Sequence, residues 1–319
     1  AVALAAWFAK RGRQPQADMI VTVTRAEESV WFPVSYAGSR MALGLLNPEE
    51  LKAKRGDTGR TLAEHMRDQD FDPDAIWGLK PPRKECFIEV HIEQGPVLSA
   101  AGDPFALVTG IRGSLRYRTA QIHGAWAHSG AAPRIARADS VFAFADLVTA
   151  LDRDWSDTLA HGDDLTVTFG IVNAASPIHA MAKVPGELSF CLDLRSDEKD
   201  ILERTNAKLA KRIAEIESQR PGIRFALGPQ SRSTPVQLSA VLLEGLRQAA
   251  LDLHRRPPEM LSGGGHDAAA FTAAGWDASM LFVRNEHGSH NPDETMDLQD
   301  LAEAVAVLAH WLDHKQDGN

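Results

Sequence analysis

A short polar loop near the end of the chain carries side chains that can bind a metal ion or move a proton. Residues 284–294 read Arg-Asn-Glu-His-Gly-Ser-His-Asn-Pro-Asp-Glu, and they follow an apolar run, residues 278–283, that is typical of a buried strand. In α/β enzymes the loop after such a strand is a common place for metal ligands and acid/base groups. A solvated polar loop is the alternative, so the hypothesis depends on similar loops elsewhere in the chain.

Two adjacent carboxylates form a second candidate. Glu27 and Glu28 follow residues 19–24, a β-branched run that predicts a strand. Carboxylates paired at a strand end can divide the work, because one can bind a metal while the other takes a proton from water. A charged turn is the alternative.

His91 is a third candidate, in the alternating segment 85–94. Alternation places it on the face opposite an apolar row, which consists of Cys86, Ile88, Val90 and Ile92. It also lies close to Gln94, just before a Gly-Pro turn. A hydrogen-bonded structural histidine is the alternative to a metal ligand.

Three further polar groups suit the recognition of a small acid. His128 lies in a loop bounded by glycines, and Arg195 closes a strand-like run. Arginine offers a rigid fork that fits a carboxylate. His266 follows three glycines at the start of a helical pattern, where backbone amides could cradle an anion. A turn cap for His128 and a surface ion pair for Arg195 are the alternatives.

The order of the predicted elements indicates how these groups are positioned. Between residues 113 and 228 we predict four strands and two helices in the order βαββαβ, with strands at 114–122, 165–172, 187–194 and 223–227 and helices at 136–151 and 198–217. This order is typical of a ferredoxin-like α+β sandwich. Residues 1–112 and 229–319 read as two halves of one mixed-sheet α/β domain. We therefore predict a two-domain α/β chain with an inserted domain.

Composition limits the partners. The 319-residue chain is 44% hydrophobic and 24% charged, with a formal net charge of -9 and no long run of Lys and Arg. We therefore expect neither nucleic acid nor an anionic membrane as a partner. The two cysteines, Cys86 and Cys191, lie in apolar alternating segments, which implies no disulfide framework and favours a reducing, cytoplasmic location.

The first residues are apolar without forming a signal-peptide pattern. Residues 1–8 lack a basic leader and a cleavage site, and basic residues follow them as they follow the end of a helix. We predict a helix of the folded domain here. No later segment reaches the length of a membrane span. Residues 47–83 are rich in charged residues and Pro, and we find no candidate catalytic or binding residue among them.

A set of motifs that occur in one order carries a family resemblance. They are R-A-E-E-S with Y-A-G-S-R, then I-E-V-H-I-E-Q-G-P-V-L, then H-G-A-W-A-H-S-G-A-A-P, and finally S-G-G-G-H-D-A with G-S-H-N-P-D-E. Together they resemble the hydantoinase/carbamoylase-type amidases of the dinuclear metallopeptidase and aminoacylase superfamily. The resemblance covers nearly the whole chain.

The resemblance implies a role for each matching residue. It implies that Glu27 is the catalytic base. It implies metal ligands at Glu28, His91 and His290. The substrate-binding groups that it implies are Gln94, His128, Arg195 and His266. It also implies two divalent ions, either zinc, manganese, cobalt or nickel, and a homodimer formed through the inserted domain. That domain would act as a lid, from which His128 and Arg195 reach the active site of the neighbouring subunit.

The implied reaction is hydrolysis of a C–N bond outside a peptide chain. The expected substrate is an N-carbamoyl amino acid or another ureido acid such as allantoate, and Gln94 with the Gly-Gly-Gly-His-Asp loop favours this class. Glu27 would deprotonate the attacking water and pass the proton to the leaving nitrogen. Alternatives are an aminoacylase or dipeptidase of the same superfamily, acting on an N-acyl amino acid or a peptide, and a catalytically inactive homologue that binds a small acid.

Two departures from the family pattern affect these expectations. The family's His-x-Asp motif and its bridging Asp are expected before Ala1, which leaves Glu28, His91 and His290 as the matching ligands. We therefore expect this chain to hold metal poorly. Ala182 stands where the family usually has an Asn before a Pro-Gly turn.

Overall fold

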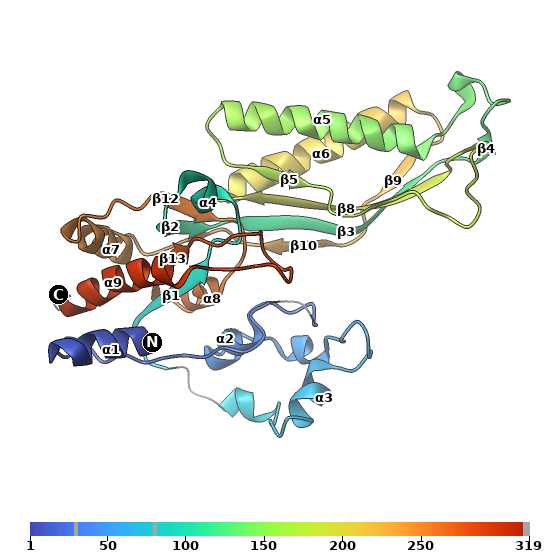
Figure 1. Cartoon of the computed structure of the whole chain (residues 1–319). Helices are drawn as coiled ribbons and strands as arrows, with labels where there is room; N and C mark the ends of the chain where they lie inside the picture. The colour runs from blue at the N-terminus through green and yellow to red at the C-terminus, as the bar shows by residue number, and fades with distance from the viewer. Residues whose placement is uncertain (29–30, 79–81, 315–319) are drawn as a thin grey trace. The chain divides into compact units, whose positions relative to one another are not determined.

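The computed structural model describes residues 1–28, 31–78 and 82–314. The chain separates into two compact units, one of Ala1–Ile111 with Gln237–Asn319 and one of Arg112–Val236 (Figure 1). The mixed α/β fold class is confirmed. Each unit has its own sheet and its own apolar core, and each is described by itself.

The sheet of unit 1 is mixed. Its strand order is β1 (Cys86–Ile92), β13 (Asp277–Val283), β2 (Phe105–Ile111) and β11 (Val236–Gln237), and β12 (Glu259–Ser262) also pairs with β2. Strands β1 and β13 run parallel, whereas β13 and β2 run antiparallel. The alternating segment and the apolar run before the polar loop therefore lie side by side, and their carboxyl ends meet at one edge.

Helices cover both faces of this sheet. On one face α7 (Ala240–Asp252) and α9 (Leu298–His314) pack on β13 and β2, and α1 (Val2–Arg11) packs on α9, around a large apolar cluster. On the other face lies α8 (Asp267–Ala273), where the ring of Phe271 stacks on that of Phe87 with centroids 3.7 Å apart. The predicted N-terminal helix is confirmed, and it ends at Gly12 in the left-handed conformation.

The part of the sequence between α1 and β1 forms a smaller apolar cluster. It is built by α2 (Ala37–Ala42), α3 (Leu62–Arg67) and two 3-10 helices, Pro48–Lys52 and Ala75–Gly78. Its buried side chains are Val34, Ala37, Leu46, Leu51 and Leu62. A further short helix, α4 (Val97–Ala101), follows β1.

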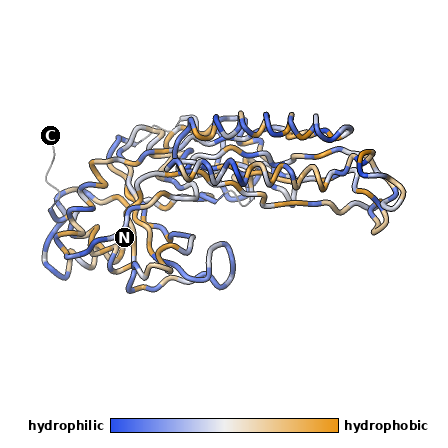
Figure 2. The backbone as a smooth tube through the Cα atoms, turned by 90° about the horizontal axis from the view of Figure 1, so that it is seen from above, coloured by the Kyte–Doolittle hydropathy of each residue, from blue (hydrophilic) through white to orange (hydrophobic). Residues whose placement is uncertain are grey.

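Unit 2 is an antiparallel sheet with two long helices on one face. Its strands are β3 (Gly113–His123), β5 (Thr166–Thr168), β6 (Val172–Asn173), β8 (Glu187–Ser196), β9 (Arg224–Ala226) and β10 (Gln230–Ser233), and a separate ribbon joins β4 (Ala127–His128) to β7 (Lys183–Val184). Helices α5 (Ser140–Ala160) and α6 (Lys199–Gln219) pack on each other and on β8. Hydrophilic and hydrophobic positions alternate along the long helices, as Figure 2 shows. Their apolar sides bury the core against the sheet.

The structure corrects the predicted strand at residues 19–24. This segment pairs with no strand among the described residues, and Ile20 and Val23 are 85% and 88% exposed. Its β-branched composition favours an extended backbone, but a strand also needs a neighbour for its N–H and C=O groups.

Other boundaries differ for local reasons. The expected strand at 165–172 is two strands, β5 and β6, separated around Gly170. Helix α5 begins after Asp139, whose carboxylate accepts hydrogen bonds from Val141 N and Phe142 N. Unit 2 extends past residue 228 because β10 pairs with β3. No helix in the described ranges is both long and apolar enough to cross a bilayer.

Candidate metal and catalytic site

His91 lies on the face of β1 that packs against α8. Its hydrogen bond fixes which ring nitrogen carries the proton. Phe87 on the same face packs against α8, whereas Cys86 and Ile88 on the opposite face pack against the other core, so the predicted alternation is confirmed. The Nδ1 atom of His91 lies 2.8 Å from the carbonyl oxygen of Ile92. Because a carbonyl only accepts, Nδ1 carries the proton, and Nε2 keeps the lone pair that a metal needs.

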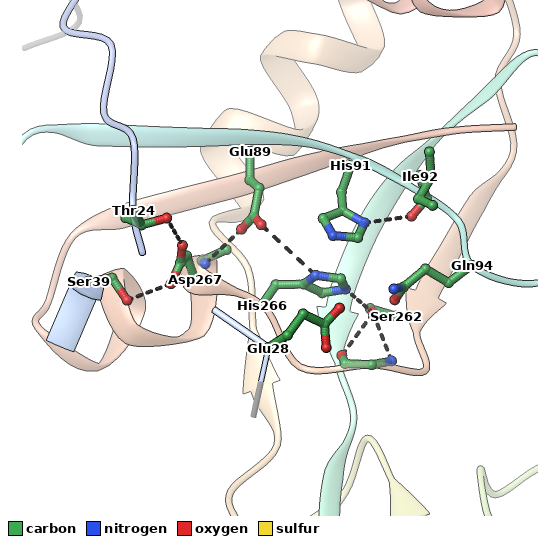
Figure 3. A network of polar contacts seen from close by, with 12 residues as sticks. Thr24, Glu28, Ser39, Glu89, His91, Ile92, Gln94, Ser262, His266 and Asp267 are labelled. Atoms are coloured by element: carbon green, nitrogen blue, oxygen red, sulfur yellow. Dashed lines mark hydrogen bonds and ion pairs between the residues drawn. The ribbon is translucent and has the colours of Figure 1, made fainter. Parts of the chain in front are cut away.

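His266 is held by a buried serine (Figure 3). Its side chain is 1% exposed, and its Nε2 lies 2.7 Å from Oγ of the fully buried Ser262. Ser262 donates its one proton to the carbonyl oxygen of Gly264 at 2.9 Å and accepts from Gly264 N at 3.2 Å. The proton between serine and histidine therefore comes from Nε2 of His266. Nδ1 is left as a buried lone pair with no hydrogen-bond partner among the described residues.

Glu89, His91 and His266 form a group that fits a divalent metal ion. One ligand atom from each lies within 4.8 Å of the other two. The Oε1 atom of Glu89 is 3.9 Å from the bare Nδ1 of His266, and the two imidazole rings have centroids 4.5 Å apart. Two neutral imidazoles and a carboxylate are the ligand types that zinc and similar ions accept. The orphaned Nδ1 makes the fit specific, because a coordinated ion would satisfy it.

Burial controls the protonation of this group in the metal-free chain. Desolvation and the nearby His91 lower the pKa of His266 to about 3, so the ring is neutral. Desolvation raises the pKa of Glu89 to about 7, although a hydrogen bond from Ala268 N to its Oε2 at 2.9 Å opposes the shift. Glu89 was not predicted as a ligand from the sequence. The available signal was its position two residues before His91, on the same face of an alternating strand.

A second pair of ligand types converges nearby. Nε2 of His290 lies 3.1 Å from Oε1 of Glu28, and the side-chain nitrogen of Gln94 lies 3.3 Å from the same Nε2. Both side chains of the Glu28–His290 pair are substantially exposed to solvent. The structure therefore brings together Glu28, Gln94 and His290, which come from three distant parts of the chain.

Glu27 lies within electrostatic reach of both groups. Its pKa is raised to about 8, mainly by burial and then by the charges of Glu28, Asp267 and Glu89. A half-buried carboxyl group next to a candidate ligand carboxylate suits a general base, and a bound cation would offset the raised pKa.

Strained backbone marks three of these positions. Ala26, Gln94 and His290 have φ angles of 54°, 63° and 62°, in the left-handed region that residues other than glycine rarely adopt. Hydrogen bonds hold two of them. Gln94 N donates to Oδ1 of buried Asn285 at 2.9 Å, and His290 N donates to Glu294 Oε2 at 3.0 Å. Such strain is concentrated at functional sites, where the surroundings hold the chain in one conformation.

Asp267 joins the segment before Glu27 to helix α8. Its carboxylate accepts a short hydrogen bond from the Thr24 hydroxyl and one from Ser39 Oγ at 2.6 Å. The last of the three glycines has a packing reason, since a Cβ at Gly265 would lie 1.5 Å from the Tyr36 hydroxyl oxygen. Asp267 and Asn285 were not identified from the sequence as site residues, because their partners are remote in the chain.

His128 and Arg195 belong to unit 2, whereas the residues above belong to unit 1. Nδ1 of His128 accepts hydrogen bonds from Gly130 N at 3.1 Å and Ala131 N at 3.2 Å, so its Nε2 carries a proton that can be donated. Arg195 is bound to Asp193 at 2.8 Å, and Asp193 also pairs with Arg116 at 3.2 Å.

Comparison with known proteins shows the family of the chain. Residues 1–314 match the model of peptidase family M20/M25/M40. The chain belongs to this family. It is 31% identical over 290 residues to an N-carbamoyl-L-amino acid amidohydrolase of Geobacillus stearothermophilus, covering 89% of this chain and 68% of the relative. It is also 31% identical over 322 residues to an allantoate amidohydrolase of Escherichia coli (strain K12), covering 97% and 75%.

Solved structures show the same fold. A hydantoinase/carbamoylase family amidase from Burkholderia multivorans superposes with a TM-score of 0.83 at 24% sequence identity, covering 97% of this chain and 73% of that one. The resemblance to hydantoinase/carbamoylase-type amidases is confirmed. The relatives named above are amidohydrolases, which supports an enzyme that acts on amides.

Proposed function

We propose that the chain is a metal-dependent amidohydrolase that cleaves a non-peptide C–N bond of an N-carbamoyl amino acid or a related ureido acid such as allantoate. The observation that carries the proposal is Glu27, a half-buried carboxylate within reach of the Glu28–His290 pair and of Glu89. The names of the two relatives support the substrate class.

The donor atoms suggest two metal positions. Glu28 and His290 would contribute to one, and the group of Glu89, His91 and His266 would hold the other. Bound divalent ions supply Lewis acidity, which polarises a carbonyl and acidifies water. Zinc, manganese, cobalt or nickel would suit these ligands. This assignment gives His266 a ligand role in addition to the substrate contact implied by the family resemblance.

The residues of the chain perform the proton transfers. Glu27 accepts a proton from the attacking water and delivers it to the leaving nitrogen, so that one carboxylate acts first as a base and then as an acid. The side-chain amide of Gln94, beside His290, is available to hydrogen-bond the ureido group.

The second unit is proposed to be a ferredoxin-like lid and dimerisation domain. The Nε2–H of His128 would stabilise the oxyanion, and Arg195 would bind the substrate carboxylate of the neighbouring subunit, with Asp193 orienting the guanidinium. Mixing Arg195→Ala subunits with Glu27→Gln subunits tests this, because a heterodimer would contain one intact site and recover activity.

The function is tested by assaying the metal-loaded chain with N-carbamoyl-L-amino acids, allantoate, N-acetyl amino acids and dipeptides in parallel. Ammonia release from the ureido substrates, absent in Glu27→Gln, is the expected result. Cleavage of only the N-acetyl amino acids or dipeptides would replace the proposal with the aminoacylase or dipeptidase alternative. No turnover with any substrate, at full metal occupancy, would indicate an inactive homologue.

A further inference from the structure

A cavity of about 380 Å³ opens beside the two adjacent carboxylates of unit 1. Ala26, Glu27 and Glu28 line it on one side. Apolar side chains form the remaining described walls, namely Trp31, Phe32, Val34, Ala37 and Leu62. The volume is within the range of small-molecule sites. The proposed base and one proposed metal ligand are therefore part of the wall of an apolar cavity.

Backbone hydrogen bonds fix the apolar wall relative to Glu27. Tyr36 N donates to Glu27 O at 3.2 Å, Ala37 N to Ala26 O at 3.2 Å and Gly38 N to Arg25 O at 2.9 Å. The approach is close, since a Cβ at Gly38 would lie 2.5 Å from the carbonyl oxygen of Arg25. The backbone of Ala37 is consequently held at a set distance from the backbone of Glu27.

Packing sets the positions of the apolar walls of the cavity. Val34, Ala37 and Leu62 are buried in an apolar cluster that also contains Leu46 and Leu51, so their positions are set by packing. Trp31 is 56% exposed, and the guanidinium of Arg55 lies 3.9 Å from its ring centroid. This cation–π contact holds the largest apolar side chain of the wall without occupying a hydrogen-bonding group of the cavity.

The chemistry of the lining selects its occupant. No Lys or Arg is among the described lining residues, and the only charged side chains are the carboxylates of Glu27 and Glu28. An acidic substituent here would lose its hydration, and the described lining offers it no Lys or Arg as a partner. A second ureido group, as in allantoate, would leave most of its polar atoms unpaired against the apolar walls. An aliphatic or aromatic group gains from leaving water.

We infer that this cavity receives the side chain of the substrate, and that the substrates are N-carbamoyl derivatives of amino acids with aliphatic or aromatic side chains. The inference rests on the proposed function and narrows it. The apolar walls of the cavity would thereby set the substrate specificity, next to the two carboxylates that are proposed to bind metal and move protons.

The first test compares kcat/KM of the metal-loaded chain for N-carbamoyl-L-leucine, N-carbamoyl-L-phenylalanine, N-carbamoylglycine, N-carbamoyl-L-aspartate and allantoate. A filled apolar pocket discriminates by roughly 10- to 200-fold. We therefore expect leucine and phenylalanine derivatives to exceed the glycine derivative by at least about tenfold, with aspartate and allantoate below it. Equal values for leucine and glycine, or a preference for aspartate or allantoate, would overturn the inference and leave the amidohydrolase proposal standing.

A matched pair of variants tests whether the preference for the leucine derivative arises in this cavity. Leu62→Ala removes a wall of the cavity, whereas Leu51→Ala truncates the same residue type in the same buried cluster without touching the lining. We expect Leu62→Ala to lower the leucine-to-glycine ratio by about threefold or more, and Leu51→Ala to leave the ratio unchanged. Equal changes in both variants would mean that selectivity does not arise in this cavity.

Calorimetry distinguishes failure of the side-chain cavity from failure of the proposed function. The Glu27→Gln chain, loaded with metal, binds without turnover, and we expect it to bind N-carbamoyl-L-leucine at least about tenfold more tightly than N-carbamoylglycine. Equal or undetectable binding of both would refute the side-chain cavity. Tight binding of the leucine derivative, together with no hydrolysis of any ureido acid by the unmodified chain, would refute the proposed function and retain the cavity.

Discussion

Ser262→Ala is the substitution that tests the metal group most directly. Ser262 is fully buried, and its hydroxyl is the only partner in the described structure for the Nε2–H of His266. Removing the hydroxyl leaves that N–H unpaired, together with the backbone N–H of Gly264 that donated to it. The imidazole then gains by moving its proton to Nδ1, where Glu89 can accept it, and the lone pair proposed to bind metal is lost.

The structure sets the expected magnitudes. An unpaired buried donor costs about 1–3 kcal/mol, so the free energy of unfolding should fall by an amount in that range. Loss of a partner that orients a ligand typically weakens metal binding by about 10- to 100-fold. We expect both effects, with the metal effect largest for the tighter-bound ion.

Two measurements check the mechanism. Competition with a chelator gives the zinc affinity, and nitrogen NMR of the imidazole side chains reports which ring nitrogen of His266 carries the proton. We expect Nε2 to be protonated in the metal-free parent chain and the Nδ1 form to appear in Ser262→Ala.

Ser279→Ala is the control. Ser279 is also a fully buried serine in unit 1, but its hydroxyl has no hydrogen-bond partner among the described residues. Its removal should leave zinc affinity unchanged. If Ser262→Ala also retained the parental affinity and the Nε2 tautomer, the serine would not orient His266 and the proposed ligand group would be wrong.

Four further predictions follow from the same geometry. Glu27→Gln should lower turnover by roughly two or more orders of magnitude while zinc content stays constant, and full activity in a metal-replete sample would exclude a general base here. Arg195→Lys should raise KM by losing the bidentate fork, with the melting temperature little changed; unaltered steady-state kinetics in Arg195→Ala would contradict the clamp. The metal-free chain should bind one zinc equivalent more tightly than a second, since one proposed position has three described ligands and the other has two; mass spectrometry after dialysis would show two equally retained ions if the ligand sets are wrong. Because burial raises the pKa of Glu89 from 4.5 to about 7, the folded metal-free chain holds a proton that the unfolded chain has lost, so Glu89 alone should lower the free energy of unfolding by about 3 kcal/mol as pH rises through that window, and the raised pKa of Glu27 adds to the fall. Urea titrations at several pH values should show a shallower fall in Glu89→Gln, and an identical profile would disprove the shift.

The sequence alone predicted those elements whose side-chain pattern is local. Alternation in residues 85–94 placed Glu89 and His91 on one face, and the structure confirms that face. Strand β13 was predicted from its continuous apolar run, which is also a local signal. A period of two residues in strands and of 3.6 residues in helices follows from backbone geometry, so such patterns can be recognised in the sequence before the fold is known.

Residues 19–24 show where local pattern fails. Their β-branched side chains favour an extended chain, but whether an extended chain becomes a strand depends on a ladder partner supplied from elsewhere. The apolar cavity had no local signal either. Its walls combine the segment after Glu28 with Leu62 of α3, in a region whose composition indicated no chemistry.

The sequence by itself determined which side chains are candidates for the site, since Glu27, Glu28, His91 and His290 are recognisable by residue type and motif. The tertiary structure decided how the side chains are grouped. Parallel pairing of β1 with β13, and packing of α8 against both strands, brings His266 beside His91 and Glu89. The physical reason is that a tautomer, a raised pKa and a cavity all arise from burial and from contacts between residues remote in the chain, which no local periodicity encodes.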